Sequence, residues 1–460
     1  MTLKRPSNNQ STPRIRYSVA MPFFEKTVFE ALLNRLETSN RIYVAYSGGI
    51  DSHVLLHVCA SIPLLQKKMI AVHIHHGLQA VADAWPKHCR SVARQLGVNF
   101  VDIYVDARRV GRESPEEAAR NARYDALKAL LSQNDVLLVA QHREDQLETV
   151  LLQLFRGAGL QGLSGMPEVM TFGKGVLLRP FLNTSKQVID QYARQHDLNF
   201  VEDPTNLSID FDRNFLRNEI VPLLKQRWPS IDKTVSRSAI HCAESSELLS
   251  KLAGDQFKQV YRTKDATLSI SALVKLDVAE QALVVRHWFA SLGLKMPSRA
   301  FVLRVLSMVQ SPLGDPQLPN QKHTIRRFRN HLFCVPQQTV ALPEQGVKWP
   351  NRDEPLDLPD GTELKLAYDC SGIDQSVWLR SKIEVKFRSG GEKIALPNRE
   401  GRHRLKNLYQ EAGIPPWERP YIPLIYLDGC LAAVADRWIG SEFYCENKPG
   451  CIRLIQSRKK

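Results

Sequence analysis

Four short runs of β-branched and aliphatic residues recur at intervals of about thirty residues early in the chain, and helix-patterned stretches separate them. The runs cover residues 41–46, 69–75, 100–105 and 136–140. One separating stretch begins with Ser114, Pro115 and Glu117, a capping box with proline in the first helical position. Strands that alternate with helices indicate βαβ units and a parallel sheet buried on both faces. We therefore expect a doubly wound α/β domain over residues 21–225.

The rest of the chain predicts an arm, two more domains and a linker. Residues 1–20 carry lysines and arginines but no apolar stretch, which indicates a flexible basic arm and not a secretory signal. One long amphipathic stretch over 230–262 and two shorter ones over 278–292 and 298–309 predict a mostly helical middle domain over 226–335. Prolines among polar residues predict a linker over 336–360. Short strand-like runs and one helix predict a small α+β C-terminal domain over 361–460.

The charge of the chain bears on its partners. Lysine and arginine number 62 against 48 acidic residues, which gives a net charge of +14. One interpretation is a merely basic surface, and the other is a polyanionic partner, most commonly nucleic acid. A small polyphosphate such as ATP does not need so much positive charge, which favours RNA. No apolar run is long enough to cross a bilayer, so no membrane partner is expected.

The cysteines bear on the compartment. The chain has 8 cysteines, which are scattered and never form a Cys-x-x-Cys pair. This pattern predicts reduced thiols in a cytoplasmic protein, and it argues against a zinc ribbon or a disulfide framework.

A glycine-rich loop follows the first predicted strand. It reads Ser47-Gly48-Gly49-Ile50-Asp51-Ser52. The two glycines let the backbone approach an anion, and the helix expected from Ile50 onward offers free N–H groups to phosphate. The two serines add hydroxyl donors, while Asp51 can face a magnesium ion or cap the helix. An ordinary glycine turn is the alternative, but ligands of open α/β sheets bind at this end of the strands. The loop therefore predicts ATP binding.

Two better-known nucleotide motifs do not account for this loop. No Gly-x-x-x-x-Gly-Lys-Ser/Thr sequence occurs in the chain, so the loop is not a Walker loop. A Gly-x-Gly-x-x-Gly occurs at Gly157, Gly159 and Gly162, but it follows a predicted helix over 145–156 and not a strand. We interpret Gly157 as a helix C-cap and exclude a dinucleotide site.

A second polar cluster follows the run at 136–140. His142, Asp145 and Glu148 should open a helix at the same edge of the sheet as the glycine-rich loop. The two carboxylates are three residues apart and share a helix face. Oxygen ligands beside phosphates are what Mg²⁺ prefers, although acidic residues are also common in a solvated first turn. With the loop on a neighbouring strand, a metal site that also includes Asp51 is the favoured interpretation.

Several further residues are candidates for the nucleotide pocket. His73 and His75 share a strand face and raise the question of zinc, but no cysteine or third carboxylate lies nearby in the sequence. A pocket or packing role is therefore favoured, with His75 and His142 as the candidates. Arg120 could reach a phosphate, as could Arg123, although surface ion pairs are the commoner fate of such residues.

Taken together, eleven segments resemble the N-type ATP pyrophosphatase (PP-loop) superfamily and, within it, the bacterial tRNA(Ile)-lysidine synthetases. In order these are Ser47–Ser52, His73–Leu78, Ala119–Tyr124, Asp145–Thr149, Arg156-Gly157, Leu178–Pro180, Glu202–Asn206, Arg213–Arg217, Leu405-Lys406, Ile414–Arg419 and Pro423-Leu424. The resemblance spans most of the chain. One departure is that the family often has Asp-Asp where this chain has Glu144-Asp145. Which of these two carboxylates holds the metal is left open.

The resemblance implies a two-step ligation that uses ATP and Mg²⁺. ATP adenylates the C2 oxygen of the wobble cytidine in the CAU anticodon of tRNA(Ile), with release of diphosphate. The amine of free L-lysine then displaces AMP, and the codon read changes from AUG to AUA. Arg213 and Arg217 are candidates for tRNA contact. The lysine-binding residues, the base that deprotonates lysine, the rejection of tRNA(Met) and the choice between monomer and homodimer stay open.

Three rival functions are weighed on sequence features. A tRNA thiolase of the same superfamily is the main alternative, but such enzymes generally use paired cysteines, which this chain lacks. An amidotransferase would need a glutaminase domain, yet Thr2 and not cysteine follows Met1. An RNA-binding module with a decayed ATP site is opposed by the intact loop and by Asp145 and Glu148.

Overall fold

The computed structural model describes most of the chain. The described residues are 35–75, 85–105, 115–204, 208–310, 316–320, 322–337, 342–343, 346–352, 354–359 and 361–458, with the backbone alone described at 115–117 and 458. The predicted arm at 1–20, the capping residue Ser114 and the segment 76–78 lie outside them. The chain divides into two compact units, residues 1–252 and 253–460.

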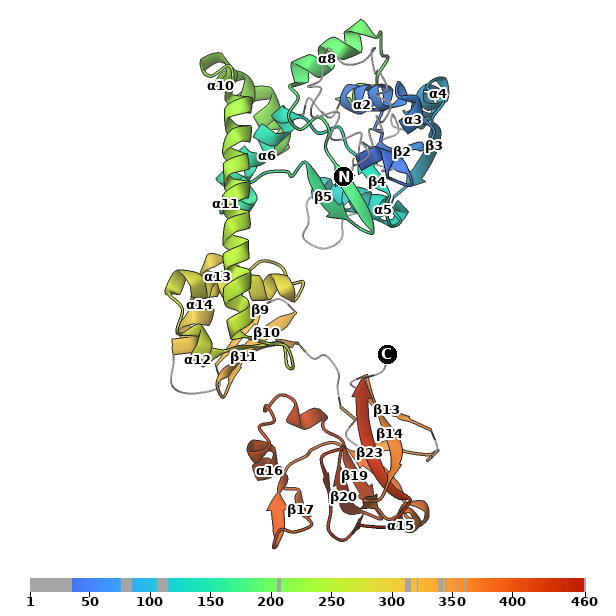
Figure 1. The fold of residues 1–460 in the computed structure, drawn as a ribbon, viewed down its shortest axis with the longest axis vertical. Helices are drawn as coiled ribbons and strands as arrows, with labels where there is room; N and C mark the ends of the chain where they lie inside the picture. Colours follow the sequence, from blue (N-terminus) through green and yellow to red (C-terminus); the bar gives the residue numbers. More distant parts are fainter. Residues whose placement is uncertain are drawn as a thin grey trace, which may run out of the picture. The chain divides into compact units, whose positions relative to one another are not determined.

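The N-terminal unit is built on a six-stranded sheet of order β3-β2-β1-β4-β6-β5 (Figure 1). Its strands are β1 (Ile42–Ala45), β2 (Met69–His75), β3 (Asn99–Tyr104), β4 (Val136–Leu138), β5 (Val169–Phe172) and β6 (Gly175–Leu178). Neighbouring strands run parallel, except that β5 pairs antiparallel with β6. The predicted parallel sheet is therefore confirmed. The hairpin that β5 forms at its edge was not predicted.

Helices cover both faces of this sheet. Those of the unit are α2 (Ile50–Ala60), α3 (Pro63–Gln66), α4 (Trp85–Gln95), α5 (Pro115–Leu130), α6 (Arg143–Phe155), α7 (Leu160–Leu163), α8 (Lys186–Gln195), α9 (Asp212–Phe215), the π-turn η3 (Leu216–Ile220) and α10 (Val221–Arg227). Ile42 and Val44 pack in one core with α2, α4 and α8, whereas Tyr43 packs in a second core with α5. Alternate residues of one strand thus face opposite helical layers, as a doubly wound fold requires.

The Gly-x-Gly-x-x-Gly motif has the structure expected of a helix end. Helix α6 ends at Phe155, and Gly157 follows with a φ of +68°, the left-handed conformation that glycine supplies just beyond helices. The next amide, of Ala158, donates to the carbonyl oxygen of Gln153 at 3.0 Å and closes the end. The C-cap interpretation is confirmed.

The middle part of the chain combines helices with a small sheet. Its helices are α11 (Ile231–Val260), which crosses the division between the units, α12 (Ile270–Leu273), α13 (Val278–Ser291) and α14 (Arg299–Gln310). Its antiparallel sheet has the order β7-β8-β11-β10-β9, with strands Tyr261–Arg262, Thr267–Ser269, His331–Pro336, His323–Phe328 and Gln317–Asn320. Trp288 and Phe289 are fully buried in the shared core. The predicted helices are confirmed, but the sheet was not predicted.

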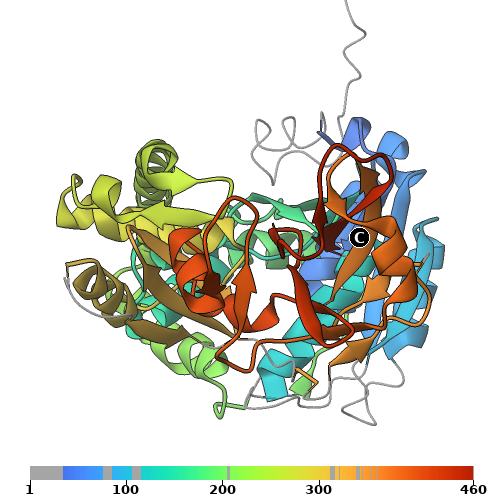
Figure 2. The same cartoon turned by 90° about the horizontal axis from the view of Figure 1, so that it is seen from below.

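The C-terminal part contains two five-stranded antiparallel sheets around one core, drawn in orange and red (Figures 1 and 2). The first is β12 (Val347–Lys348), β16 (Ile383–Lys386), β19 (Leu424–Leu427), β20 (Cys430–Val434) and β21 (Trp438–Ile439). The second is β13 (Leu356–Asp357), β14 (Thr362–Asp369), β23 (Cys451–Arg458), β15 (Gly372–Ile373) and β22 (Tyr444–Cys445). The hairpin β17 (Lys393–Ala395) and β18 (Arg402–Arg404), α15 (Gln375–Arg380), α16 (Leu405–Glu411) and the turn η4 (Arg419–Tyr421) complete it. The predicted α+β class is confirmed.

The segment expected to be a linker, 336–360, takes part in this fold. It contributes β12 and β13, and Trp349, Leu356 and Leu358 are each less than 9% exposed in the C-terminal core. From Val347 onward the linker expectation is therefore corrected. Three apolar side chains among the prolines outweigh the turn signals, because burying each of them away from water lowers the free energy of the folded state.

The cysteines also require a correction. Cys445 and Cys451 form a disulfide, so reduced thiols are wrong for this pair. The other 6 cysteines are free, as expected. Among the described residues, no helix combines the length and the apolar character that a membrane span requires.

Candidate active site

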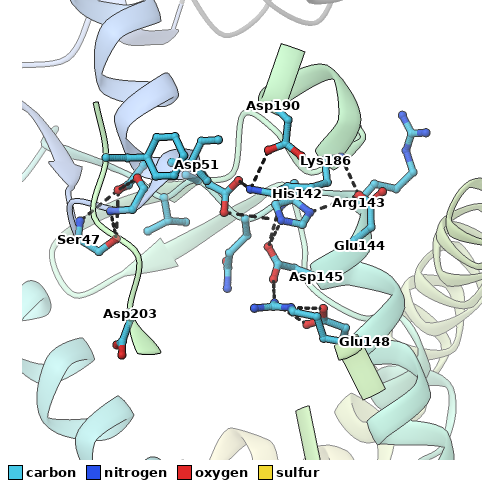
Figure 3. A pocket seen from close by; sticks show the side chains of 18 of the residues that line it. Ser47, Asp51, His142, Arg143, Glu144, Asp145, Glu148, Lys186, Asp190 and Asp203 are labelled. Carbon is cyan, nitrogen blue, oxygen red and sulfur yellow. Dashed lines mark hydrogen bonds and ion pairs between the residues drawn. The ribbon is translucent and has the colours of Figure 1, made fainter. Parts of the chain in front are cut away.

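The polar residues singled out above converge where the strand order reverses. The glycine-rich loop follows β1 and helix α6 follows its parallel neighbour β4, so both lie at the carboxyl edge of the sheet. Helix α8 begins beyond β6 at the same edge. These segments line a cavity of about 2110 Å³ (Figure 3). Such a switch point is the usual binding place for ligands in open α/β sheets.

Hydrogen bonds between its own groups shape the glycine-rich loop. The Ser47 and Ser52 hydroxyls lie 3.1 Å apart, and Ser52 Oγ donates to the carbonyl oxygen of Gly49 at 2.9 Å. Gly48 has a φ of +90°, and a Cβ there would lie 3.1 Å from the sulfur of Cys89. Gly49 is the N-cap of α2 and makes no side-chain cap, so the first amides of the helix are left to a ligand.

His142 stands at the centre of three carboxylates. Its Nε2 lies 3.9 Å from Asp51 Oδ2 and 3.4 Å from Asp145 Oδ2, and its Nδ1 lies 3.3 Å from Glu144 Oε2. Burial by itself would lower the pKa of His142. The hydrogen bond to Glu144 and the charges of Asp145 and Asp51 outweigh burial, so the pKa is raised. His142 thus lies among three acidic side chains that favour its protonated form.

Asp145 and Glu148 are bound by two arginines that are the candidates for tRNA contact. Arg213 Nε donates to Glu148 Oε2 at 2.8 Å, and Arg217 Nε donates to Glu148 Oε1 at 2.7 Å. Arg217 also donates to Asp145 Oδ1 at 2.9 Å. Both oxygens of Glu148, whose side chain is 2% exposed, therefore accept guanidinium N–H groups. Figure 3 labels the two carboxylates, with Asp145 next to His142 and Glu148 farther from it.

Glu144 and Asp145 have different surroundings. Glu144 accepts from the backbone amide of Lys186 at 2.9 Å and from Lys225 Nζ at 2.9 Å, so it ties α6 to α8 and α10. Although burial opposes it, these bonds and His142 hold the pKa of Glu144 far below its ordinary range. His142 and Arg213 likewise lower the pKa of Asp145 against its burial. Both carboxylates are therefore ionised at neutral pH. Of the two, Glu144 is the one whose hydrogen bonds connect three helices.

Asp51 is paired with a residue that sequence analysis missed. Lys186 Nζ forms a short ion pair with Asp51 Oδ1, and it lies 3.3 Å from Asp190 Oδ1 in the next turn of α8. Lys186 could have been identified as a lysine in the first turn of a helix that follows a strand of the same sheet. It was missed because the strand β6 was not predicted.

The remaining candidates divide between the cavity and the surface. His73 and His75 line the cavity and are buried, and His75 packs against Tyr104 at 4.9 Å between ring centroids. Arg123 also lines it, and burial lowers the pKa of its guanidinium. Arg120 instead lies exposed over the ring of Tyr124, outside the cavity lining.

A protein-only metal cage is not present in the part of the chain that the structure describes. No group of three or more histidine, cysteine, aspartate or glutamate side chains there has metal-binding geometry. Asp51 and Asp145 nevertheless both face His142 Nε2 in the cavity. One or two carboxylates completed by substrate phosphates and water is the usual donor set for Mg²⁺, and these two residues fit it.

The fold and the loop define a PP-loop ATPase, and comparison with known proteins agrees. Residues 23–224 match the family model described as "PP-loop domain". Residues 268–333 match "TilS substrate binding domain", and residues 383–455 match "TilS substrate C-terminal domain". These matches cover parts of all three predicted domains.

Curated relatives specify the family. A tRNA(Ile)-lysidine synthase of Methylococcus capsulatus is 39% identical over 87% of this chain and 92% of its own length. A tRNA(Ile)-lysidine synthase of Legionella pneumophila is 36% identical over 90% of this chain and 95% of its own. The chain belongs to the tRNA(Ile)-lysidine synthase family. A solved U34-tRNA thiolase of Methanococcus maripaludis is similar only at 12% identity and a TM-score of 0.38, covering 48% of this chain and 81% of that one.

Proposed function

We propose that the chain joins free L-lysine to C2 of the wobble cytidine of tRNA(Ile) with the CAU anticodon. ATP first transfers AMP to the C2 oxygen, and diphosphate leaves. The lysine side-chain amine then attacks C2, a C–N bond forms, and AMP leaves with the oxygen. The observation that carries this proposal is the cavity at which the glycine-rich loop meets the paired carboxylates, in a chain whose relatives carry this activity by name.

The loop residues Ser47 to Ser52 would bind the ATP phosphates. The amides at the start of α2, which no side chain caps, and the Ser47 hydroxyl belong to residues that line the cavity and can donate to phosphate oxygens. Charge builds up on the diphosphate as the bond to the α-phosphate breaks, and fixed donors stabilise that charge without reorganising. His75 would lie near the nucleotide, whereas the exposed Arg120 is a weaker candidate for phosphate contact.

A magnesium ion would be held by Asp51 and Asp145. Bound there, it would neutralise phosphate charge and orient the triphosphate. Glu148 would not bind the magnesium ion directly, because its two oxygens already accept hydrogen bonds from Arg213 and Arg217. It would fix the position of these arginines at the cavity and so orient Asp145.

Contact of Arg213 and Arg217 with the tRNA remains part of the proposal. Arg217 lines the cavity, so a splayed wobble base would pass close to its guanidinium. The basic surplus of the chain would bind the phosphate backbone elsewhere. We propose a cytoplasmic location, where ATP, lysine and tRNA occur together, and a homodimer stays a prediction for sedimentation analysis.

The decisive experiment incubates the protein with ATP, Mg²⁺, labelled lysine and tRNA(Ile) bearing CAU. We expect stable label in the tRNA and one AMP released per lysine joined. ATP consumption without lysine incorporation would refute the proposed product while leaving ATP use intact.

A site variant separates ATP chemistry from RNA binding. Asp51→Ala should abolish adenylation, because the carboxylate would face the phosphates, yet leave tRNA affinity nearly unchanged. Asp125→Ala, an exposed aspartate of α5, is the matched control and should retain activity. An equal loss of tRNA binding in Asp51→Ala would contradict the proposed division of labour.

A further inference from the structure

We propose that Lys186 is a phosphate-binding residue that exchanges its Asp51 partner for the triphosphate of ATP. The proposal rests on the proposed function, since it concerns the same ATP site. It adds a cation from a helix that none of the recognised motifs includes, and it assigns the ion pair with Asp51 to the ATP-free enzyme.

The backbone places Lys186 at the loop. It is the first residue of α8, and its amide donates to Glu144 Oε2, which anchors the helix start beside α6. From there the side chain reaches Asp51, 135 residues earlier in the chain (Figure 3). Among the described residues, no other lysine or arginine forms an ion pair with a residue of the loop.

The exposure of its partners distinguishes Lys186 from three other cations at the site. Arg213 and Arg217 pair with Glu148, 2% exposed, and Lys225 pairs with Glu144, 12% exposed. Removing these partners would leave a buried carboxylate without its counter-charge, which is strongly unfavourable. The partners of Lys186 are different, because Asp51 is 34% and Asp190 is 33% exposed. Water can solvate both carboxylates when the ammonium group turns away.

The charges also favour the exchange. A lysine ammonium is a flexible point charge on four methylene groups, and a triphosphate carries several negative charges where Asp51 carries one. Asp190, 3.3 Å from Nζ and one turn along α8, keeps the ammonium group on the cavity side of the helix. ATP binding would thus replace one ion pair by another and release the Asp51 carboxylate towards the phosphates.

Ligand binding by charge-removing variants tests this inference. The full-length Lys186→Met protein should bind ATP and inorganic pyrophosphate roughly ten- to a hundredfold more weakly, as expected for loss of a hydrogen bond to a charged group. The KM for ATP should rise by the same factor, while the KM for lysine should not. Lys186→Arg, which keeps the charge, should restore most of the affinity. Calorimetry and the ATP-dependent rise in melting temperature provide the readouts.

Controls make the outcome specific. Lys174→Met removes an exposed lysine from the turn between β5 and β6 and should bind both ligands as the unaltered protein does. Lys186→Gln provides a second test should the methionine variant fail to fold. Unchanged pyrophosphate and ATP affinity in a folded Lys186 variant would overturn the inference. Failure of the unaltered protein to bind ATP would instead overturn the proposed function.

Discussion

Gly48 shows how one residue sets the shape of the phosphate loop. At its φ of +90°, a residue with a Cβ is strained, and that atom would also press on Cys89. We therefore expect Gly48→Ala to lower the free energy of unfolding by roughly 1–3 kcal/mol and to weaken ATP binding. Urea titration and calorimetry measure the two effects.

Gly159→Ala is the matched control for this prediction. Gly159 has a φ of −79° and open space around its Cα, so the free energy of unfolding should change little. If Gly48→Ala changed the free energy of unfolding as little as Gly159→Ala, the loop would tolerate a Cβ at position 48 and the prediction would be wrong.

Glu148 tests the buried ion-pair network. Glu148→Gln removes the charge that compensates two guanidinium groups, so we expect the free energy of unfolding to fall by about 3 kcal/mol. Glu247→Gln, an exposed glutamate of α11, should change it by less than about 0.5 kcal/mol. Denaturant unfolding compares them. A stability near that of the unaltered protein would show that Arg213 and Arg217 find other partners.

At the scale of elements, the packing of α2 on α8 contains a titratable contact. His57 Nδ1 lies 3.0 Å from the Tyr192 hydroxyl, and the His196 ring lies 5.1 Å away. Burial, with a smaller contribution from His196, lowers the pKa of His57 from its ordinary value of 6.5. The unfolded chain therefore binds this proton more readily than the folded protein. Stability from this contact is fully present above pH 6.5 and is lost as the pH falls below it.

His57→Gln should flatten that dependence. We expect the variant to lose less stability than the unaltered protein between about pH 7 and pH 5, because glutamine does not titrate there. Urea unfolding at several pH values measures the slope. His241→Gln, an exposed histidine of α11, is the control and should keep the original slope. Identical slopes in all three proteins would contradict the assignment to His57.

Element prediction succeeded where the sequence pattern was long. The runs at 69–75 and 100–105 and the long helix α11 were found within about two residues of their observed ends. The middle sheet was missed because its two six-residue strands, β10 and β11, do not alternate apolar with polar residues, and its other strands have only 2 to 4 residues. Lys186 was missed for a related reason, since its position depends on the unpredicted strand β6.

At the scale of the whole molecule, the net charge of +14 predicts how RNA binding responds to salt. If tRNA displaces counterions at roughly 6–10 phosphates, its affinity should fall about 10³- to 10⁵-fold between about 50 and 200 mM salt. Filter binding across this range measures the slope. ATP binding in the same buffers is the control, because it should weaken far less. A flat response would refute the electrostatic role of the basic surplus.

The sequence alone determined the α/β class, the glycine-rich loop and the acidic residues beyond β4, because each depends on local pattern and on strand ends that share one edge. The tertiary structure decided how the charges pair. Arg213 and Arg217, the candidates for tRNA contact, hold Glu148 and Asp145, and Lys186 reaches Asp51 across 135 residues. Such pairings depend on which helices the fold brings to the same edge of the sheet. Spacing along the chain does not encode that, because the partners come from separate βα units and meet only when the sheet forms.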